Sequence, residues 1–588
     1  MLTEMKPGSV KRPVSWPWAV VMAFCLLLLW GPLAALSPYN ALGDTLTVIQ
    51  LPLLNIPAIH IPGETLAVTC IAPANTTGWQ AWLVHKQKSL PLNITSSQYL
   101  GDPDRWELQA IVPSVPVFEL YDLRVTASGG IDDTTANAVK VLPTRRNNYY
   151  FVHITDLHLP SQIYYPDYGF DSDSTSVNDF RAVIDDINLI NPEFVLLTGD
   201  LLNEGELEGF AGQYFYGWTQ RLLAEFDVPC YVTVGNHDVG GWNSTPPPQG
   251  SSRRNWWRYF GWAWLDNPDS NWPLHTQDYD FTYGDLHFIG LEAYDNYDNW
   301  RAYIYGSQSF TARQIIWLNQ RLSLHPDKTR VLFTHYDFSE QLNLDEMGID
   351  LALWGHIHYN SGSINAYPYN LATRSVCDGN RAYRVIRVNG TQVQPLSTIY
   401  AGNNGQSVNV VWFPSNAAEA DSVAAMFNNN QPVAFEQALL KFHMPPGNVS
   451  YGVTNGTLLQ VDRYDTENVC YVQVDLPAMQ SRIVSVAAQA GAAVGDPVQP
   501  EYHLIRGAWP NPFSRQLNLE LNSRNASARV RVYNLRGTRI RELPVSSDGA
   551  SCQWDGALES GIPAPAGIYL LKVDVGKSSE LIRVVKSF

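Results

Sequence analysis

Cysteine is scarce in this chain, and its spacing is irregular. Six cysteines occur in 588 residues, and one of them, Cys25, lies in an apolar segment near the amino terminus. The other five are far apart and include no Cys-x-x-Cys pair; they are Cys70, Cys230, Cys377, Cys470 and Cys552. This pattern excludes a disulfide framework. The sequence leaves room for two disulfide bonds at most and predicts no particular pairing.

Positive charge is also scarce. Only 16% of the residues are charged, and 39 Lys and Arg residues stand against 56 Asp and Glu residues, which gives a formal net charge of −17. A nucleic-acid backbone requires a basic surface, so we expect no nucleic acid among the habitual partners. Aromatic residues make up 12% of the chain, which indicates packed, strand-rich domains rather than disorder. A chain of 588 residues is too long for one hydrophobic core and predicts a multidomain protein.

Residues 1–36 have the features of a signal peptide. The segment begins with the basic residues Lys6, Lys11 and Arg12. An apolar run from Ala19 to Trp30 follows, and the small pair Ala34-Ala35 suits a cleavage site. The apolar run is short for a membrane span, so an uncleaved anchor is the less favoured alternative. We therefore expect the chain to be exported.

Five short polar clusters lie in the middle of the chain, each directly after an apolar run. They are Asp156-Leu157-His158, Gly199-Asp200, Gly235-Asn236-His237-Asp238, Thr334-His335 and Gly355-His356-Ile357-His358. The runs before them are short and rich in β-branched and aromatic residues, as are strands buried on both faces. Because ligands gather at the carboxyl ends of the strands in open α/β sheets, we expect the clusters to meet at one edge. Their carboxylates, imidazoles and amide would then form a metal site.

The number of donors favours two metal ions over one. Tetrahedral zinc accepts four ligands, whereas the clusters offer seven: Asp156, His158, Asp200, Asn236, His335, His356 and His358. Mixed nitrogen and oxygen donors suit iron, manganese, zinc or cobalt better than magnesium or calcium. Two ions about 3.5–4 Å apart need a bridging ligand, and an aspartate such as Asp200 can lend one oxygen to each.

In order and spacing, the clusters resemble the calcineurin-like metallophosphoesterases, whose pattern is D-x-H, GD, GNH[DE], a lone His after a strand, and GHxH. All five blocks occur in this order over roughly residues 148–390. The resemblance implies an α/β catalytic domain over residues 147–396, with two packed β-sheets flanked by helices. It also implies two divalent ions, Fe, Mn or Zn. The first would be held by Asp156, His158, Asp200 and His358, and the second by Asp200, Asn236, His335 and His356.

The resemblance assigns further roles to the third cluster. His237 binds no metal in the family pattern and would protonate the leaving oxygen or stabilise its charge, while Asp238 would orient the His237 ring. A hydroxide that bridges the two ions near neutral pH would be the nucleophile. The purple acid phosphatase branch has a Tyr where this chain has Asn203, so no tyrosinate–iron chromophore is expected. A metal-free relative is the alternative, but no ligand position is missing.

Between the clusters, apolar residues recur at helical spacing. One stripe comprises Phe180, Ile184 and Ile187; another comprises Tyr214, Trp218 and Leu222. Thr311 and Gln314 predict a capping box before a third stripe, which comprises Ile315, Leu318 and Leu322. The alternation of strands and helices predicts right-handed crossovers with helices outside the sheets.

The regions on either side of the catalytic domain show no helical periodicity. Residues 40–146 contain short alternating runs separated by Pro, Gly and Asn, which predicts an antiparallel Ig-like β-sandwich. Residues 397–497 predict a second β-rich module, and the stretch from Ala487 to Pro500 is typical of a linker. His443 stands alone in that module and is expected to be structural.

Residues 242–275 form an insertion rich in aromatic residues, directly after the third cluster. It contains Arg253, Arg254, Trp256, Trp257, Tyr259, Phe260, Trp262, Trp264 and Trp272. These rings could form a wall that grips the leaving group, with an arginine near the phosphate. They could instead pack the insertion onto the sheet, and we favour this structural interpretation.

The carboxyl-terminal residues 503–588 carry a second resemblance. The blocks WPNPF, VYNLRG, WDG and AGIY begin at Trp509, Val532, Trp554 and Ala566. They recur in this order in the sorting domains of the type IX secretion pathway and in the related Ig-like domain of flagellar hook-cap proteins. The resemblance implies contact with the secretion machinery and a protein that is secreted or held at the bacterial outer cell surface. An ordinary terminal binding module is the alternative.

Taken together, these features predict a secreted, dinuclear-metal-dependent hydrolase of phosphate esters. The substrate would be a small molecule or a lipid head group, with a phosphodiester slightly favoured over a monoester because extracellular family members are often scavengers. The alternative is a surface adhesion or glycan-binding protein in which the phosphoesterase-like domain is inactive and the β-modules carry the function.

Overall fold

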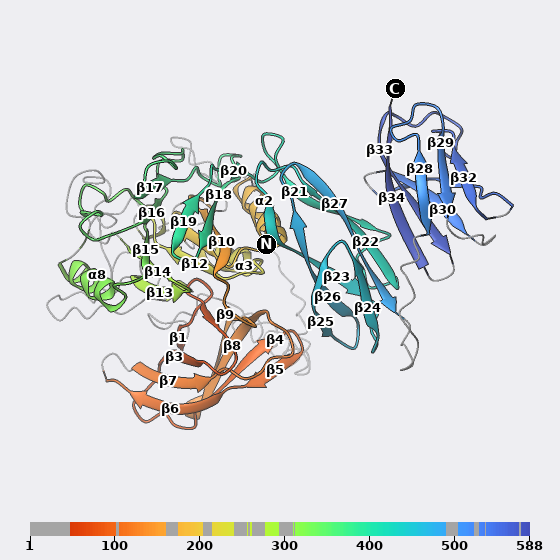
Figure 1. Ribbon diagram of the computed structural model, residues 1–588. Helices are drawn as coiled ribbons and strands as arrows, with labels where there is room; N and C mark the ends of the chain where they lie inside the picture. Colours follow the sequence, from red (N-terminus) through yellow and green to blue (C-terminus); the bar gives the residue numbers. More distant parts are fainter. Residues whose placement is uncertain are drawn as a thin grey trace, which may run out of the picture. The chain divides into compact units, whose positions relative to one another are not determined.

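The architecture is that of a computed structural model (Figure 1). It describes residues 48–101, 105–159, 175–203, 215–239, 256, 259–261, 277–292, 310, 312–489, 504–521, 528–534, 537–547, 549–575 and 578–587. The expected signal peptide, most of the expected linker, and Thr311 of the expected capping box lie outside these residues. No helix of the described part has the length and apolarity that a membrane crossing requires.

Residues 49–141 form two β-sheets, with strand orders β1-β3-β7-β6 and β2-β9-β8-β4-β5. The strands are β1 Ile49–Leu51, β2 Ala58–His60, β3 Thr65–Ile71, β4 Gln80–His85, β5 Lys88–Pro91, β6 Asn93–Tyr99, β7 Arg105–Ile111, β8 Leu120–Ala127 and β9 Ile131–Val141. Burial alternates along β7, where Trp106, Leu108 and Ala110 face the core. One pair departs from the predicted antiparallel order: β2 runs parallel to β9, because the chain leaves the first sheet between β1 and β2 and no hairpin sets the direction of β2.

The next two sheets carry the five polar clusters. Their orders are β12-β11-β10-β18-β19, with β20 also paired to β18, and β13-β14-β15-β16-β17. The strands are β10 Asn148–Ile154, β11 Val195–Thr198, β12 Cys230–Thr233, β13 Tyr279–Tyr283, β14 Leu286–Gly290, β15 Thr329–Phe333, β16 Leu351–Trp354, β17 Tyr369–Ala372, β18 Ala382–Asn389, β19 Gln392–Pro395 and β20 Ile399–Tyr400. All residues of β11, β12 and β16 are buried, as expected for parallel strands covered on both faces.

Aromatic rings fill the space between these two sheets. Phe151 of β10 stacks on Phe194 with ring centroids 5.3 Å apart and meets Phe288 of β14 edge-on at 5.4 Å. Because β10 and β14 belong to different sheets, the sheets pack face to face around these rings. The predicted α/β arrangement of two packed sheets is therefore confirmed.

The helices of this region follow the predicted apolar stripes. They are α2 Thr175–Ile190, α3 Phe215–Leu223, the short α4 Asn236–Val239 and α8 Ala312–Leu324. The stripe of α2 is buried at Phe180, Ile184 and Ile187, and Leu318 of α8 is fully buried. These stripes belong to the core cluster that also contains residues of β10 and β11, so the helices cover the outer faces of the sheets.

The described part of the aromatic insertion packs inward. Trp256 and Phe260 are 1% and 0% exposed, and the Trp256 Nε1–H donates to Gln277 Oε1 at 3.0 Å. Tyr259 stacks on Tyr216 of α3 with ring centroids 5.6 Å apart. For these three rings the structural interpretation agrees with the packing; the other aromatic residues of the insertion lie outside the described residues.

Two further pairs of sheets follow. Residues 408–489 form the sheets β21-β22-β27-β24 and β23-β26-β25, and residues 505–586 form the sheets β28-β29-β32 and β31-β30-β33-β34. The first set comprises β21 Val408–Phe413, β22 Ser422–Asn429, β23 Phe435–Met444, β24 Ser450–Thr454, β25 Thr457–Arg463, β26 Asn468–Leu476 and β27 Gln480–Gln489. The second comprises β28 Ile505–Trp509, β29 Leu517–Leu521, β30 Arg529–Asn534, β31 Arg539–Leu543, β32 Ser551–Trp554, β33 Gly567–Val575 and β34 Ser578–Lys586.

The ring of Phe151 supplies a test of how the two catalytic sheets are held together. Phe151→Ala would remove a fully buried ring between them and is expected to lower the free energy of unfolding by about 3–5 kcal/mol. Ile316→Ala is the control, because this side chain is 56% exposed and its truncation should change stability by no more than about 0.5 kcal/mol. Denaturant unfolding of both variants measures the difference; equal midpoints would contradict this packing.

Candidate metal centre

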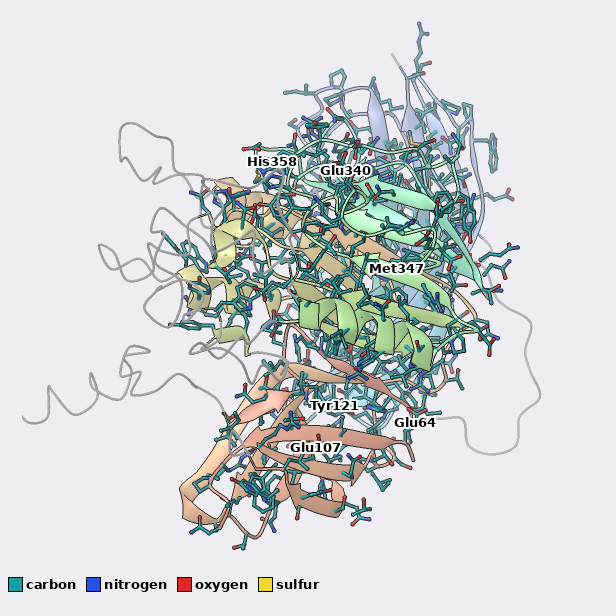
Figure 2. The ribbon with its side chains drawn as sticks, turned by 90° about the vertical axis from the view of Figure 1, so that its left-hand side faces the viewer. Glu64, Glu107, Tyr121, Glu340, Met347 and His358 are labelled. Carbon is teal, nitrogen blue, oxygen red and sulfur yellow. The ribbon has the colours of Figure 1, made fainter. Side chains whose placement is uncertain are left out.

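The five polar clusters sit at the carboxyl ends of five strands. Strands β10, β11 and β12 run parallel to one another, and so do β15 and β16. The clusters begin one or two residues after these strands end, so the sheet geometry carries all of them to one edge. Figure 2 labels His358 and Glu340, which come from the loops after β16 and β15.

The seven predicted donors converge around the carboxylate of Asp200. Asp200 Oδ2 lies 3.0 Å from His335 Nε2 and 3.6 Å from His158 Nε2. On the His335 side, Asn236 Oδ1 is 3.1 Å from His335 Nε2, and the ring centroids of His335 and His356 are 5.2 Å apart. Two groups of donors therefore flank one aspartate.

The other group gathers on the His158 side of that aspartate. His358 Nε2 lies 3.1 Å from His158 Nε2 and 3.5 Å from Asp156 Oδ1. Asp156 Oδ2 accepts hydrogen bonds from the His356 backbone N–H at 2.9 Å and from the Thr155 hydroxyl at 2.8 Å. The structure thus brings all seven predicted side chains together.

Glycines at the start of three of the clusters allow this close approach. A Cβ on Gly235 would lie 2.2 Å from the backbone nitrogen of Asp200, and one on Gly355 would lie 1.8 Å from Thr155 Oγ1. A Cβ on Gly199 would lie 2.7 Å from the backbone of Gly235. Any side chain at these positions would push the loops apart, which explains the glycines of the GD, GNH and GHxH motifs.

The backbone at the donors is strained. Positive φ angles occur at Asp156 (55°), His158 (48°), Asp200 (52°), His356 (67°) and His358 (59°). Non-glycine residues adopt this left-handed region at a cost, and they do so mainly where a functional site requires it. This left-handed conformation turns each of the five side chains from the end of its strand toward the common centre.

The protonation states of three buried donors suit metal binding. Burial acts to raise the pKa of Asp200, but His335 and His237 outweigh it and hold the pKa well below its usual range. Burial, aided by neighbouring imidazoles, lowers the pKa of His356 to about 3 and that of His158 well below its usual value. An ionised carboxylate and neutral imidazoles are the forms that bind metal ions.

The pKa values of two further donors indicate that the cluster needs positive charge. Burial raises the pKa of Asp156, which marks a carboxylate with too little compensating positive charge. Burial acts to lower the pKa of His335, yet Asp200 raises it to about 9. A proton on His335 partly neutralises Asp200, and a divalent cation at the same place would do so as well. The donor set therefore fits cations.

The third cluster corrects one sequence-based expectation. Asp238 does not orient the ring of His237: its two carboxylate oxygens accept from the backbone N–H groups of Leu202 and Gly235, at 3.0 and 2.8 Å. The Nδ1 of His237 contacts the backbone carbonyl of Asn203 instead. Asp238 lies within α4 and is fully buried, and two backbone donors use both of its oxygens. It therefore holds two loops together rather than the imidazole.

The structure reveals a residue that the motifs did not indicate. Asp378 lies in the loop after β17, and its Oδ2 is 3.0 Å from His358 Nδ1. The other ring nitrogen of His358, Nε2, faces Asp156. Carboxylates in this position orient a metal-binding imidazole and increase its basicity. Cys377 Sγ also contacts Asp378 Oδ2 at 3.3 Å. Neither residue belongs to a motif, so only spatial proximity identifies them.

A fully buried polar chain lies beneath the centre. Its middle member is His153 of β10, whose ring nitrogens lie 2.7 Å from Thr373 Oγ1 and 2.8 Å from Thr198 Oγ1. The carbonyl of Thr198 is 2.8 Å from His335 Nδ1, and Thr373 Oγ1 accepts from Arg384 Nε at 3.0 Å. Burial holds the pKa of His153 well below its usual value, so the ring is neutral. The chain joins a donor of the centre to strands of one sheet and, through Thr373, to the end of β17 in the other sheet.

Comparison with known proteins gives two family matches. Residues 149–360 match the model of the calcineurin-like phosphoesterase family, and residues 507–587 match the model of the secretion system C-terminal sorting domain. A Moraxella catarrhalis protein described as a probable cyclic nucleotide phosphodiesterase is 33% identical over 100 residues, which are 17% of this chain and 31% of that protein. The match therefore spans about a third of that relative's length.

Two solved structures show remote likeness. A purple acid phosphatase from yellow lupin seeds (Lupinus luteus) covers 62% of this chain and 70% of its own, with 10% identity and a TM-score of 0.33. A dimetal phosphatase from Danio rerio covers 43% of this chain and 99% of its own, with 17% identity and a TM-score of 0.29.

The sorting domain indicates secretion or attachment at the outer cell surface. The chain thus carries a calcineurin-like phosphoesterase domain at residues 149–360, which contain the whole converging donor set, and a secretion system C-terminal sorting domain at residues 507–587.

Proposed function

We propose that this protein is an exported, dinuclear-metal-dependent hydrolase of phosphate esters. The observation that carries the proposal is the convergence of seven donors from five strand ends on the buried carboxylate of Asp200. The match of residues 149–360 to the calcineurin-like phosphoesterase family supports it. So does the match of residues 507–587 to a sorting domain, which implies contact with a secretion machinery.

The grouping of the donors suggests how two divalent ions would be shared. Asp156, His158, Asp200 and His358 would hold one ion, and Asp200, Asn236, His335 and His356 would hold the other. Asp200 lies between the groups, with its Oδ2 within 3.6 Å of a nitrogen from each, as a bridging ligand must. Mixed imidazole and carboxylate donors suit Fe, Mn or Zn.

The residues around the donors divide the chemical work. Two divalent ions, when bound, supply Lewis acidity toward the phosphoryl oxygens and a deprotonated water as nucleophile. His237 stands at the rim of the donor set, with its ring centroid 4.8 Å from that of His158, and its backbone N–H donates to Asp200 Oδ1 at 2.9 Å. The carbonyl of Asn203 contacts Nδ1 and sets the ring orientation, and His237, when protonated on both ring nitrogens, would give its Nε2 proton to the leaving oxygen.

The substrate class and the accessory modules are parts of the same proposal. A phosphodiester is favoured over a monoester, in line with the name of the Moraxella catarrhalis relative, and a lipid head group is one such substrate. We further propose that residues 1–36 are a cleaved signal peptide and that residues 40–146 are an Ig-like domain. Residues 397–497 would be a β-rich module with its linker, and residues 503–588 would be an Ig-like sorting domain. The net charge of −17 argues against nucleic acid as a partner.

Replacement of the shared aspartate tests the metal centre. Asp200→Asn keeps the shape of the side chain and removes the charge that both ions would share. We expect loss of hydrolysis of bis-p-nitrophenyl phosphate to background with Mn²⁺, Zn²⁺ or Fe²⁺, together with loss of bound metal. Wild-type activity in this variant, or no turnover by the wild-type protein with any metal, would contradict the proposal. The second outcome would favour the binding-protein alternative.

A leaving-group comparison tests His237. His237→Ala should lower kcat by roughly 10²–10⁴-fold for an alkyl phosphate ester, whose leaving oxygen needs a proton. The loss should be much smaller for a p-nitrophenyl ester, whose leaving group is stable without one. His443→Ala is the matched control, because His443 pairs with Glu467 at 2.6 Å in the β-module. Equal losses for both esters would exclude proton donation by His237.

Asp378 should act through His358. Asp378→Asn would retain a hydrogen-bond acceptor but remove the charge beside His358 Nδ1, and should weaken metal affinity by about 10–100-fold. Asp337→Asn is the control. Asp337 lies in the loop after β15, where its Oδ1 accepts hydrogen bonds from the Ser339 backbone N–H and from Asn370 Nδ2. Activity measured against metal concentration separates the two variants: added metal should restore Asp378→Asn, and a defect that metal cannot restore would argue against this role.

A further inference from the structure

A second cluster of imidazole and carboxylate groups lies outside the donor set described above. It consists of Asp280 of β13, His287 of β14 and His325, which directly follows α8. Each side chain offers one donor atom, and the three donor atoms lie within 4.8 Å of one another. None of the three residues takes part in the proposed hydrolysis.

The sheet register explains why two of these side chains meet. Strands β13 and β14 are antiparallel, with Thr282 opposite His287 and Asp280 opposite Ile289. Side chains two residues apart share a face of a strand, so Asp280 and His287 are diagonal neighbours on one face. His325 completes the group, and its ring meets that of His287 edge-on with centroids 4.7 Å apart.

His287 and Asp280 place two donor atoms side by side. His287 is 0% exposed, and its Nε2 lies 2.8 Å from Asp280 Oδ2. An ion held by both atoms would take the place of the proton between them, because metal ligands bind in their deprotonated forms. Nε2 and Oδ2 are therefore the donor atoms that a shared ion would use, and Nδ1, on the far side of the ring from Asp280, would carry the proton of the neutral imidazole.

The surrounding charges are compatible with a cation. Arg321 Nε contacts the other oxygen of Asp280, Oδ1, at 3.5 Å and leaves Oδ2 on the imidazole side. Its side chain is 41% exposed and can turn toward solvent. Lys328 directs its Nζ to the carbonyl of Gly284. Partial burial, followed by the neighbouring His287, lowers the pKa of His325, so this ring is neutral near pH 7, as a metal ligand must be.

We propose that Asp280, His287 and His325 form a separate, mononuclear site for a zinc-like transition-metal ion. Two imidazoles and one carboxylate, with water as the fourth ligand, are a donor set that tetrahedral zinc accepts. Bond lengths of about 2.0–2.2 Å require the donor atoms to close in slightly from their present separations. The ion would join the end of α8 to the β13–β14 hairpin, so its main effect would be on stability rather than on hydrolysis.

Metal counting on the full chain tests the proposal. Protein stripped with a chelator is equilibrated with Zn²⁺ and desalted, and bound zinc per chain is measured by elemental analysis. His325→Ala, which replaces a half-buried side chain, should bind one zinc fewer than the wild type and should lose part of the zinc-dependent rise in Tm. Asp280→Asn should weaken zinc binding at this site by about 10-fold or more, because loss of a charged ligand costs at least as much as loss of a residue that only orients one.

The controls make the result specific. His443→Ala removes another half-buried imidazole that is bonded to a carboxylate, and it should keep the wild-type zinc count and Tm shift. Hydrolysis of bis-p-nitrophenyl phosphate should be unchanged in His325→Ala. An unchanged zinc count in His325→Ala, or an equal loss in His443→Ala, would overturn the proposal. Because zinc content is the readout, absence of hydrolysis by the wild type would contradict the proposed function and leave this result intact.

Discussion

The buried carboxylate of Asp200 is the group on which the catalytic region depends. A carboxylate removed from water is costly unless it is paired and hydrogen-bonded. Here Oδ1 accepts from the His237 backbone and Oδ2 faces the rings of His335 and His158. Its own carbonyl accepts from the backbone N–H groups of Leu157 and His158. One aspartate thereby ties four of the five clusters to one point, and cations shared across it would complete its neutralisation.

Rigid sheets make this arrangement possible. The left-handed backbone of five donors would relax in an isolated loop, but each of these donors lies within five residues of a fully buried strand residue. Glycines at positions 199, 235 and 355 let the loops approach to distances that no side chain would allow. Beneath them, His153 links strands of both sheets through hydroxyl groups, so the two sheets support the centre jointly.

Much of the candidate site could be predicted from the chain alone, because its motifs combine donor chemistry with strand-end position. The donors follow apolar runs that became buried strands, and the parallel pairing of those strands then brings the donors together. Asp378 escaped prediction because no periodicity or motif surrounds it; the loop after β17 merely returns to His358. The role that the resemblance implied for Asp238 differs from its contacts, since a motif does not show which backbone donors the oxygens of a side chain will meet.

By itself, the sequence determined the inventory: which side chains offer nitrogen and oxygen donors, which runs become strands and helices, and which carboxyl-terminal blocks resemble a sorting domain. All three can be predicted because they depend only on the type of each residue and on the residues near it in the sequence. Only the tertiary structure decided that Asp280 and His287 would meet His325, that Asn203 would contact His237, and that β2 would run parallel to β9. Such contacts join residues far apart in the chain, and they depend on how whole sheets and helices pack.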